Sequence, residues 1–186
     1  MQIITPRSKR RRRKPGELKV YRPGYVIVAD TREQAPFGFT GIPPLASEGD
    51  AVAPLVVRRT LATGDYSIVG MESVIAIERK SVADLFGTLG KGRERFAREF
   101  ERLAAMKWAA VVVEGDYVSI RDCPPGYSRM SAESIEGTID SWSIKFPAIH
   151  WFLCPDRRAA EIRTFRLLDK AWKYLRHDPA DGRSIA

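Results

Sequence analysis

The sequence has few of the residues that most often bind transition metals or act as nucleophiles. Of its 186 residues, two are cysteine and two are histidine. Cys123 and Cys154 form no Cys-x-x-Cys metal motif, and one pair builds no disulfide framework, so we expect two reduced, packed side chains. His150 and His177 lie near the ends of a predicted strand and a predicted helix with no partner motif, which gives little support to a serine, cysteine or histidine nucleophile.

Long apolar runs are also missing. No stretch reaches the roughly 18–20 apolar residues that cross a bilayer, and the basic N-terminus lacks the apolar run of a secretory signal. The sequence has no Gly-x-x-x-x-Gly-Lys loop, so we expect no ATP-driven activity. These absences favour a soluble, intracellular protein, cytoplasmic and nucleoid-associated in a prokaryote or virus and nuclear in a eukaryote.

Positive charge is abundant but is concentrated at one end of the chain. The formal net charge is +8, and residues 7–14 carry seven basic side chains and no acidic one. Such a run has no apolar face to bury, so we expect a disordered basic arm over residues 1–20 that binds a phosphate backbone. The residues of this arm expected to bind DNA are Arg10, Arg11, Arg12, Arg13 and Lys14. A solubilising leader and a nuclear-import signal are the alternatives.

Apolar content and length indicate one folded domain. Hydrophobic residues make up 44% of the chain and aromatic residues 10%, which argues against disorder, collagen and coiled coil. A single hydrophobic core usually serves a chain of this length. We therefore expect one domain over residues 21–178, between the basic arm and a short tail over residues 179–186.

The spacing of apolar residues predicts strands that alternate with helices in the second half of the chain. The expected strands cover residues 25–29, 55–61, 66–69, 74–77, 109–113 and 149–153, and the expected helices cover residues 81–89, 93–106, 131–146 and 156–176. Residues 34–54 are expected to form a long surface loop or an irregular region, and residues 115–130 a loop. Arg95 and Glu99 are expected on the exposed face of their helix. The predicted fold class is α/β, with a mixed central β-sheet flanked by helices.

Two acidic side chains and a lysine come together at the end of the predicted hairpin of residues 66–77. A turn at the centre of this segment makes Asp65 and Glu78 equidistant from it, so they lie opposite each other. Side chains alternate along a strand, so Glu78 and Lys80 project to one face and Arg79 projects to the other. Two carboxylates then face one point, with a lysine beside them.

This arrangement suits a hard divalent cation. Mg²⁺ binds one or two carboxylates, keeps several waters and is completed by substrate phosphates. The metal can polarise a phosphodiester and lower the pKa of a bound water, while the ammonium group of Lys80 orients that water or stabilises negative charge. The sequence therefore predicts phosphodiester hydrolysis. The alternative is an ordinary surface ion pair between Glu78 and Lys80, with Asp65 as a turn residue.

A second polar cluster, Asp30-Thr31-Arg32-Glu33, follows the first predicted strand. Asp30 ends a buried apolar run, where its carboxylate either joins the metal site or supports it, and Arg32 can bind a phosphate bidentately. Local ion pairing in a solvated loop is the alternative. Asp84 is equally ambiguous, because it lies three residues after Ser81, where a carboxylate stabilises a helix N-terminus with or without an active site.

These residues resemble the nuclease domain of the XPF-type structure-specific endonucleases, a branch of the restriction-endonuclease-like PD-(D/E)XK group. The family signature is Gly-Asp, a variable hairpin, and Glu-Arg-Lys with an Asp four residues after the Lys. Here it stands as Gly64-Asp65-Tyr66, Glu78-Arg79-Lys80 and Asp84. Residues 30–33 match the upstream Asp-x-Arg-Glu element, and Gly92-Arg93 and the strand that ends in Glu114 are also similar. The resemblance covers roughly residues 25–175.

The resemblance implies a metal-dependent nuclease site and the restriction-endonuclease-like fold. It makes Asp65 and Glu78 the metal ligands, with Asp30 and the backbone of Arg79 as further candidates, and it places Lys80 at the water or the transition state. The full set of implied catalytic residues is Asp30, Arg32, Glu33, Asp65, Glu78, Arg79, Lys80 and Asp84. We also expect Lys91 and Arg93 to bind DNA. The implied cofactor is Mg²⁺, with Mn²⁺ as a substitute, and the implied substrate is DNA with a single-strand/double-strand junction.

The leading hypothesis is therefore a metal-dependent DNA endonuclease that acts near flaps, forks or recombination intermediates. A non-catalytic DNA-binding or scaffold subunit of a repair or recombination complex and a junction resolvase are the alternatives. Many family members continue into a tandem helix-hairpin-helix domain, for which we see no room here, so we expect the basic arm to replace part of that grip. We also expect a homodimer or heterodimer through the helices that contain Trp142 or Trp172, and no membrane partner.

Overall fold

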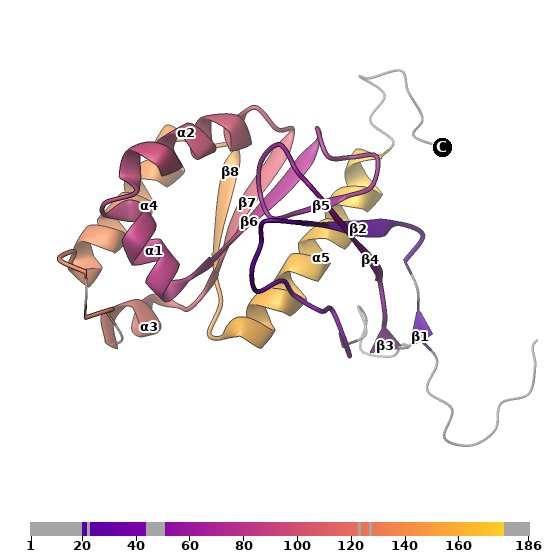
Figure 1. The fold of residues 1–186 in the computed structure, drawn as a ribbon, viewed down its shortest axis with the longest axis horizontal. Coiled ribbons are helices and arrows are strands. Elements are labelled where there is room, and N and C mark those ends of the chain that lie inside the picture. Colours follow the sequence, from indigo (N-terminus) through magenta and orange to yellow (C-terminus); the bar gives the residue numbers. More distant parts are fainter. Residues whose placement is uncertain (1–19, 22, 44–50, 123, 127, 177–186) are drawn as a thin grey trace, which may run out of the picture.

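The computed structural model describes residues 20–21, 23–43, 51–122, 124–126 and 128–176. The basic arm, the C-terminal tail, Cys123 and His177 lie outside these residues. The strands are β1 (Val20–Tyr21), β2 (Val26–Asp30), β3 (Ala51–Val52), β4 (Leu55–Arg59), β5 (Tyr66–Ile68), β6 (Ile75–Ser81), β7 (Trp108–Glu114) and β8 (Ile149–Leu153). Six of them form the central sheet, in the order β4-β2-β5-β6-β7-β8, and β1 pairs with β3 beside it (Figure 1).

The central sheet combines parallel and antiparallel pairing. β2 is parallel to β4 and antiparallel to β5, and β5 and β6 form an antiparallel hairpin. β7 is parallel to both of its neighbours, β6 and β8. Residues 109–113 of β7 are all buried, as expected for a strand that is covered on both faces.

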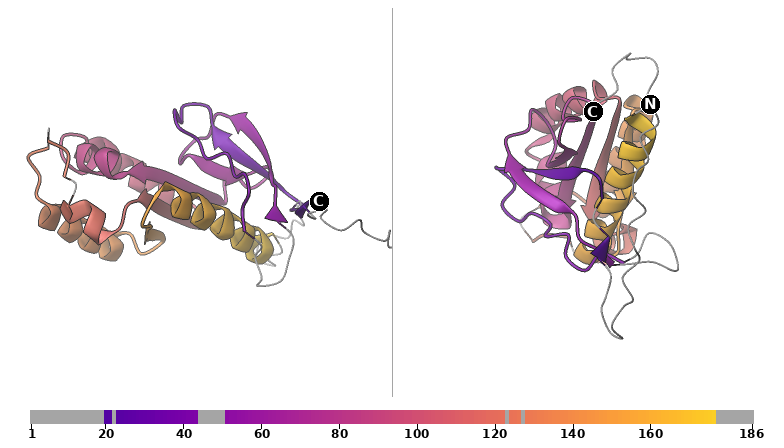
Figure 2. Two further views of the ribbon diagram at one scale, coloured as in Figure 1. Left: turned by 90° about the horizontal axis from the view of Figure 1, so that it is seen from below. Right: turned by 90° about the vertical axis from the view of Figure 1, so that its right-hand side faces the viewer.

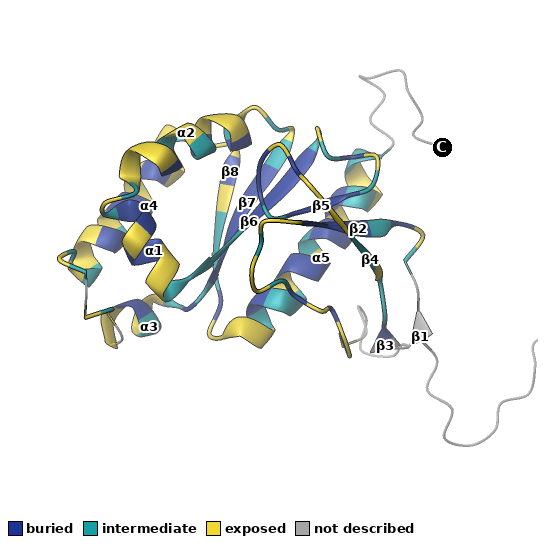
Figure 3. Ribbon diagram, viewed as in Figure 1, coloured by how far each residue is buried: buried dark blue, intermediate teal, exposed yellow. Residues whose placement is uncertain are grey.

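Helices cover both faces of the sheet. α5 (Arg157–Leu175) packs on one face, and α1 (Val82–Leu89), α2 (Arg93–Ala104) and α4 (Ala132–Lys145) pack on the other (Figure 2). Side chains alternate along β7, so Ala110 and Val112 join the core under α5, while Val111 and Val113 join the opposite core. The outer sides of α1 and α2 are exposed (Figure 3). The predicted α/β class, with a mixed sheet flanked by helices, is confirmed.

Polar residues cap three of these helices. α1, α4 and α5 follow Ser81, Ser131 and Asp156, whose side chains each accept a hydrogen bond from the backbone N–H three residues later. Such a cap satisfies one of the amides that a helix leaves free at its start. The four helices predicted from the sequence are confirmed.

The sequence predicts a surface loop or irregular region over residues 34–54. The described residues 34–43 lie outside the named helices and strands, as expected, but their aromatic side chains do not lie at the surface. Phe37, Phe39 and Ile42 are almost fully buried in the core under α5. The ring of Phe37 stacks on Tyr66 with centroids 5.3 Å apart, and Phe39 meets the same ring edge-on at 5.6 Å. Proline and glycine interrupt regular structure, but burial follows from the apolar area of the neighbouring aromatic side chains.

Residues 115–130, also predicted to be a loop, contain a short helix. α3 (Tyr117–Asp122) is capped by Asp116, whose carboxylate accepts hydrogen bonds from the backbone N–H and the hydroxyl of Ser119, both at 2.8 Å. Ile120 anchors the helix in the core. Six residues are too few to show a helical period in the sequence.

Trp142 and Trp172, which lie on the helices expected at a dimer contact, pack within this chain. Trp142 is 6% exposed and packs on the rings of Phe96 and Phe100. Trp172 is half-buried and packs on Tyr25, with centroids 5.2 Å apart. The dimer contact expected through these two helices stays a prediction.

The remaining rare residues occupy structural positions. Cys154 is a free, buried thiol whose pKa burial raises, as expected of a packed side chain. His150 stacks on Trp108 with centroids 5.5 Å apart. Among the described helices, none combines the length and the apolar character needed to cross a membrane.

Candidate active site

The β5–β6 hairpin brings Asp65 and Glu78 together. Tyr66 pairs with Ile77, so the register places Asp65 opposite Glu78, as predicted. The backbone N–H of Asp65 donates to the carbonyl oxygen of Ile77 (2.8 Å), and Asp65 Oδ2 accepts from the backbone N–H of Arg79 (2.7 Å). The backbone of both strands therefore holds the two acids in place.

β6 presents Glu78 and Lys80 on one face. The strand runs to Ser81, beyond its predicted end at residue 77, because it pairs with β7 along its whole length. Lys80 Nζ donates to Glu78 Oε1 at 2.5 Å and lies 5.0 Å from the ring centre of Phe96. The side chain of Glu78 is 7% exposed and that of Lys80 is 16% exposed. The alternative of an ordinary surface ion pair is therefore wrong.

Arg79 points to the opposite face, as predicted, and joins an ionic network there. Its guanidinium donates two hydrogen bonds to Glu114 at the end of β7 (2.7 and 2.8 Å) and one to Glu33 (3.3 Å). Arg157, at the start of α5, donates to the same Glu114 (2.6 Å). Both arginines also lie over the ring of Phe37. This network joins β6, β7, α5 and the segment after β2 behind the two acids.

Asp30 is fully engaged by hydrogen bonds from the protein. Its carboxylate accepts three from Arg32, through the backbone N–H (2.7 Å), Nε and Nη2 (both 2.9 Å), and one from the backbone N–H of Leu61 (2.7 Å). Burial by itself raises the pKa of Asp30, but these bonds outweigh it and lower the pKa to about 2. Of the two roles that the sequence left open, this geometry favours support of the site and does not favour a third metal ligand.

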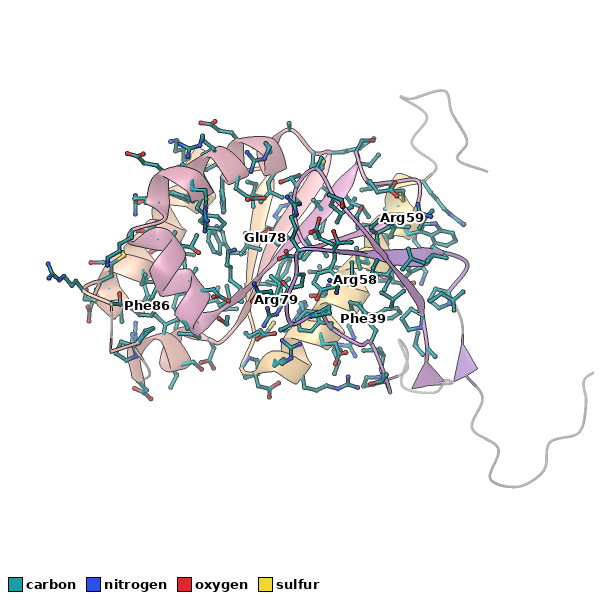
Figure 4. The ribbon with its side chains drawn as sticks, in the orientation of Figure 1. Phe39, Arg58, Arg59, Glu78, Arg79 and Phe86 are labelled. Atoms are coloured by element: carbon teal, nitrogen blue, oxygen red, sulfur yellow. The ribbon has the colours of Figure 1, made fainter. Side chains whose placement is uncertain are left out.

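The eight catalytic candidates all line one cleft of about 620 Å³. They are Asp30, Arg32, Glu33, Asp65, Glu78, Arg79, Lys80 and Asp84. Figure 4 shows Glu78 and Arg79 near the middle of the molecule, with Phe86 among the helices at one end. Asp84 also contributes to the start of α1, because its carboxylate accepts a hydrogen bond from the capping hydroxyl of Ser81 (2.7 Å). The structure thus brings the predicted residues together from segments far apart in the sequence.

Charged residues of α2, which the sequence did not assign to the site, also line the cleft. They are Arg95, Glu99 and Arg102. Glu99 accepts a hydrogen bond from Thr63 Oγ1 (3.1 Å) and lies 3.3 Å from Arg102, and its side chain is only 26% exposed, so its predicted exposed position is wrong. Helical spacing identifies the face that packs on the core, but it does not show which charged residues border a cleft formed by other elements.

Lys91 and Arg93 do not line this cleft. Lys91 borders a separate cavity beside Phe86. Arg93 donates to Thr138 Oγ1 (3.1 Å) and lies 5.5 Å from the ring centre of Trp142, so it joins α2 to α4. The DNA contacts expected of these two residues, and of the basic arm outside the described residues, stay predictions.

The surroundings of Asp65 and Glu78 disfavour their negative charge. Burial and the neighbouring Glu78 raise the pKa of Asp65 to about 8. Burial also raises the pKa of Glu78, although Lys80 opposes this change. For Lys80, burial lowers the pKa, but the attraction of Glu78 and Asp65 outweighs it, so the net change is upward and the ammonium group is retained.

This donor set fits a hard divalent cation. Among the described residues, none donates a hydrogen bond to Asp65 Oδ1 or Glu78 Oε2. Two carboxylate oxygens completed by waters and phosphate oxygens are a usual coordination of Mg²⁺, and a cation between the carboxylates offsets their repulsion. The described part of the chain contains no group of three or more His, Cys, Asp or Glu side chains arranged to hold a metal. The candidate site is therefore a two-carboxylate site with a lysine.

Comparison with known proteins places the chain in a family. The ERCC4 domain matches residues 29–162, a range that includes all eight catalytic candidates. XPF from Aeropyrum pernix has the same fold, with 19% identity and a TM-score of 0.56 over 84% of this chain and 68% of that one. XPF from Aeropyrum pernix in complex with DNA gives 18% identity and a TM-score of 0.54, over 84% of this chain and 69% of that chain. Among curated proteins no match is found. The resemblance inferred from the sequence is confirmed, and the chain belongs to the ERCC4 domain family.

Proposed function

We propose that this protein is a divalent-metal-dependent DNA endonuclease that hydrolyses phosphodiester bonds near single-strand/double-strand junctions. The observation that carries the proposal is the position of Asp65 opposite Glu78 in one cleft, with Lys80 Nζ 2.5 Å from Glu78 Oε1. Membership of the ERCC4 domain family supports it, as does the fold shared with XPF, of which one structure is a complex with DNA.

In this proposal Asp65 and Glu78 bind Mg²⁺, for which Mn²⁺ substitutes. The bound metal would polarise the phosphodiester and lower the pKa of a water. Lys80 keeps its proton because Glu78 and Asp65 stabilise its charge, so its role is to orient the attacking water and stabilise negative charge on the phosphate. Asp30 holds Arg32 at the edge of the cleft, where its exposed side chain can meet a phosphate.

Cleavage of end-labelled flap, fork, single-stranded and plain duplex DNA, in Mg²⁺ and in EDTA, tests the proposal. We expect the wild type to cut only with metal and to prefer branched DNA. Glu78→Gln and Lys80→Ala should each lower the rate by about 10²-fold or more. Glu101→Gln, an exposed change on α2 outside the cleft, is the matched control and should leave the rate unchanged.

Two outcomes would contradict the proposal. Cleavage that survives both Glu78→Gln and Lys80→Ala would show that the assigned residues do not form the active site. A well-folded wild type that binds DNA but cuts none of the substrates would favour a non-catalytic DNA-binding subunit.

Metal binding can be measured without cleavage. A ligand present at about 100 times its Kd stabilises the folded state by about 2.7 kcal/mol. We therefore expect millimolar Mg²⁺ to raise the Tm of the wild type above its value in EDTA. Asp65→Asn should remove most of this rise, because the variant keeps the acceptor for the backbone N–H of Arg79 but loses the negative charge. An equal rise in the variant would place the metal elsewhere.

A further inference from the structure

Helix α2 carries a row of arginines along the cleft. Arg95, Arg98 and Arg102, here called the α2 arginine stripe, are spaced by three and four residues and so lie on one side of the helix. Arg95 and Arg102 line the cleft, and Arg98 is exposed between them. The stripe does not pack in the hydrophobic core, because the buried residues of α2 are Phe96, Phe100 and Leu103.

Three of the cations that line the cleft are open to solvent. The side chain of Arg102 is 52% exposed and shares a single contact with Glu99. Arg95 is exposed and forms no ion pair with a described residue. Arg32, at the end of β2, has a side chain that is 65% exposed, although one edge of its guanidinium is bound to Asp30. The cleft therefore combines largely buried acids with exposed cations from two different elements.

This distribution of charge suits a phosphate chain more than a single anion. Asp65 and Glu78 repel a phosphate unless a cation lies between them, whereas arginines bind neighbouring phosphates through paired N–H groups. Arg95 and Arg102 are seven residues apart, or about 10 Å along the helix axis, so they can reach different phosphates. Both arginines line the cleft that holds Asp65 and Glu78.

We infer that the α2 arginine stripe, together with Arg32, binds the phosphate backbone of a DNA strand and lays it across Asp65 and Glu78. The inference rests on the proposed function. It adds a DNA contact at residues that differ from those expected from the sequence, which are the basic arm, Lys91 and Arg93. Phosphate contacts fix the position of a strand without reading its bases. Binding through these arginines is therefore independent of the DNA sequence.

Fluorescence anisotropy tests this inference. It measures the binding of a labelled single-stranded oligonucleotide to the full chain, in EDTA and between about 50 and 200 mM salt. Arg95→Gln should weaken binding about three- to tenfold and lower the slope of log K against log salt by about 0.7. Arg102→Gln should act in the same direction, and Arg95→Lys should restore the slope because it keeps the charge. The matched control is Arg166→Gln, on the exposed side of α5 across the sheet, which should bind as the wild type does.

The inference is overturned if Arg95→Gln and Arg102→Gln bind with wild-type affinity and slope. Equal losses in Arg166→Gln would also overturn it, because they would report net charge alone. An unchanged Tm excludes a folding defect as the cause of any loss. If the wild type does not cut DNA but Arg95→Gln and Arg102→Gln still weaken binding, the result contradicts the proposed function and not this inference. Cleavage by the wild type with unaffected binding in both variants contradicts only this inference.

Discussion

Asp30 and Asp65 are the same type of side chain at the same cleft, yet their surroundings change their acidity in opposite directions. Hydrogen bonds from Arg32 and Leu61 compensate the charge of Asp30 and hold its pKa near 2. Burial beside Glu78 raises the pKa of Asp65 to about 8. Asp30 therefore has little to gain from a bound cation, whereas a cation would complete the compensation that Lys80 supplies only in part to the Asp65–Glu78 pair.

The lowered pKa of Asp30 predicts a pH-dependent effect on stability. A carboxyl whose folded pKa lies below its unfolded value stabilises the fold above the unfolded pKa, near 4, and this contribution is lost as the pH falls through about 2. Asp30→Asn should lower the free energy of unfolding by about 1–2 kcal/mol at neutral pH, allowing for solvent screening at the exposed Arg32. Urea unfolding at pH 7 and near pH 2 measures it. An equal cost at both pH values would argue against the ionic origin of the effect.

At the scale of elements, the β5–β6 hairpin depends on a glycine before the first acid. Gly64 has a φ of +72°, in the left-handed region that other residues rarely adopt. A Cβ at this position would lie 3.1 Å from Ala76 Cβ and 3.2 Å from the carbonyl oxygen of Ile77. The Gly-Asp pair of the motif thus has a physical basis, because the backbone conformation just before Asp65 is strained for any residue with a side chain.

Gly64→Ala should therefore destabilise the fold by about 1–3 kcal/mol. Gly87→Ala is the matched control, because Gly87 lies within α1 and a Cβ there would meet no atom within 4 Å. It should be neutral or stabilise by about 0.5–1 kcal/mol through helix propensity. Chemical unfolding of the two variants measures the contrast, and similar free energies for both would contradict the role given to Gly64.

The aromatic segment between β2 and β3 makes a second prediction at this scale. Phe37 is 3% exposed and packs on Tyr66 as well as beneath Arg79 and Arg157. Phe37→Ala should lower the free energy of unfolding by about 3–5 kcal/mol. Ile144→Ala, at a side chain that is 83% exposed, should change it by less than about 0.5 kcal/mol. If Phe37→Ala were as mild as the control, the segment would not belong to the core.

At the scale of the whole molecule, four separate parts of the chain form the cleft. Its lining residues come from positions 30–35, 62–65, 78–84 and 95–102. The central sheet holds the acids, while α2 and the segment after β2 supply exposed cations on either side. The positive charge of residues 7–14 is additional to these cations and is expected to act on affinity alone.

Removal of residues 1–14 tests that separation of roles. The truncated chain should keep the Tm of the full chain, because the expected arm has no apolar face to bury. The slope of log K against log salt for single-stranded DNA should fall by up to about 5, since seven basic residues each contribute about 0.7. Anisotropy titrations of both chains measure the change, and an unchanged slope would show that the arm does not bind DNA.

The features predicted correctly from the sequence are those set by close neighbours in the chain. Alternation along β6 separates Glu78 and Lys80 from Arg79, and the length of the hairpin sets Asp65 opposite Glu78. Ser81 starts α1 because its side chain reaches a backbone amide three residues away. These relations involve short distances along the backbone, so the sequence by itself determined most of the strands and helices of the central sheet and the motif at the candidate site.

Contacts between distant segments were decided only by the tertiary structure. Glu114 and Arg157 are 43 residues apart, and Thr63 and Glu99 are 36 residues apart, yet each pair is joined by a hydrogen bond. The burial of Phe37 and the place of α2 beside the cleft have the same origin. The free energy of burial depends on which surfaces meet when the whole chain folds. The spacing of residues within one segment does not show which distant segment it will pack against.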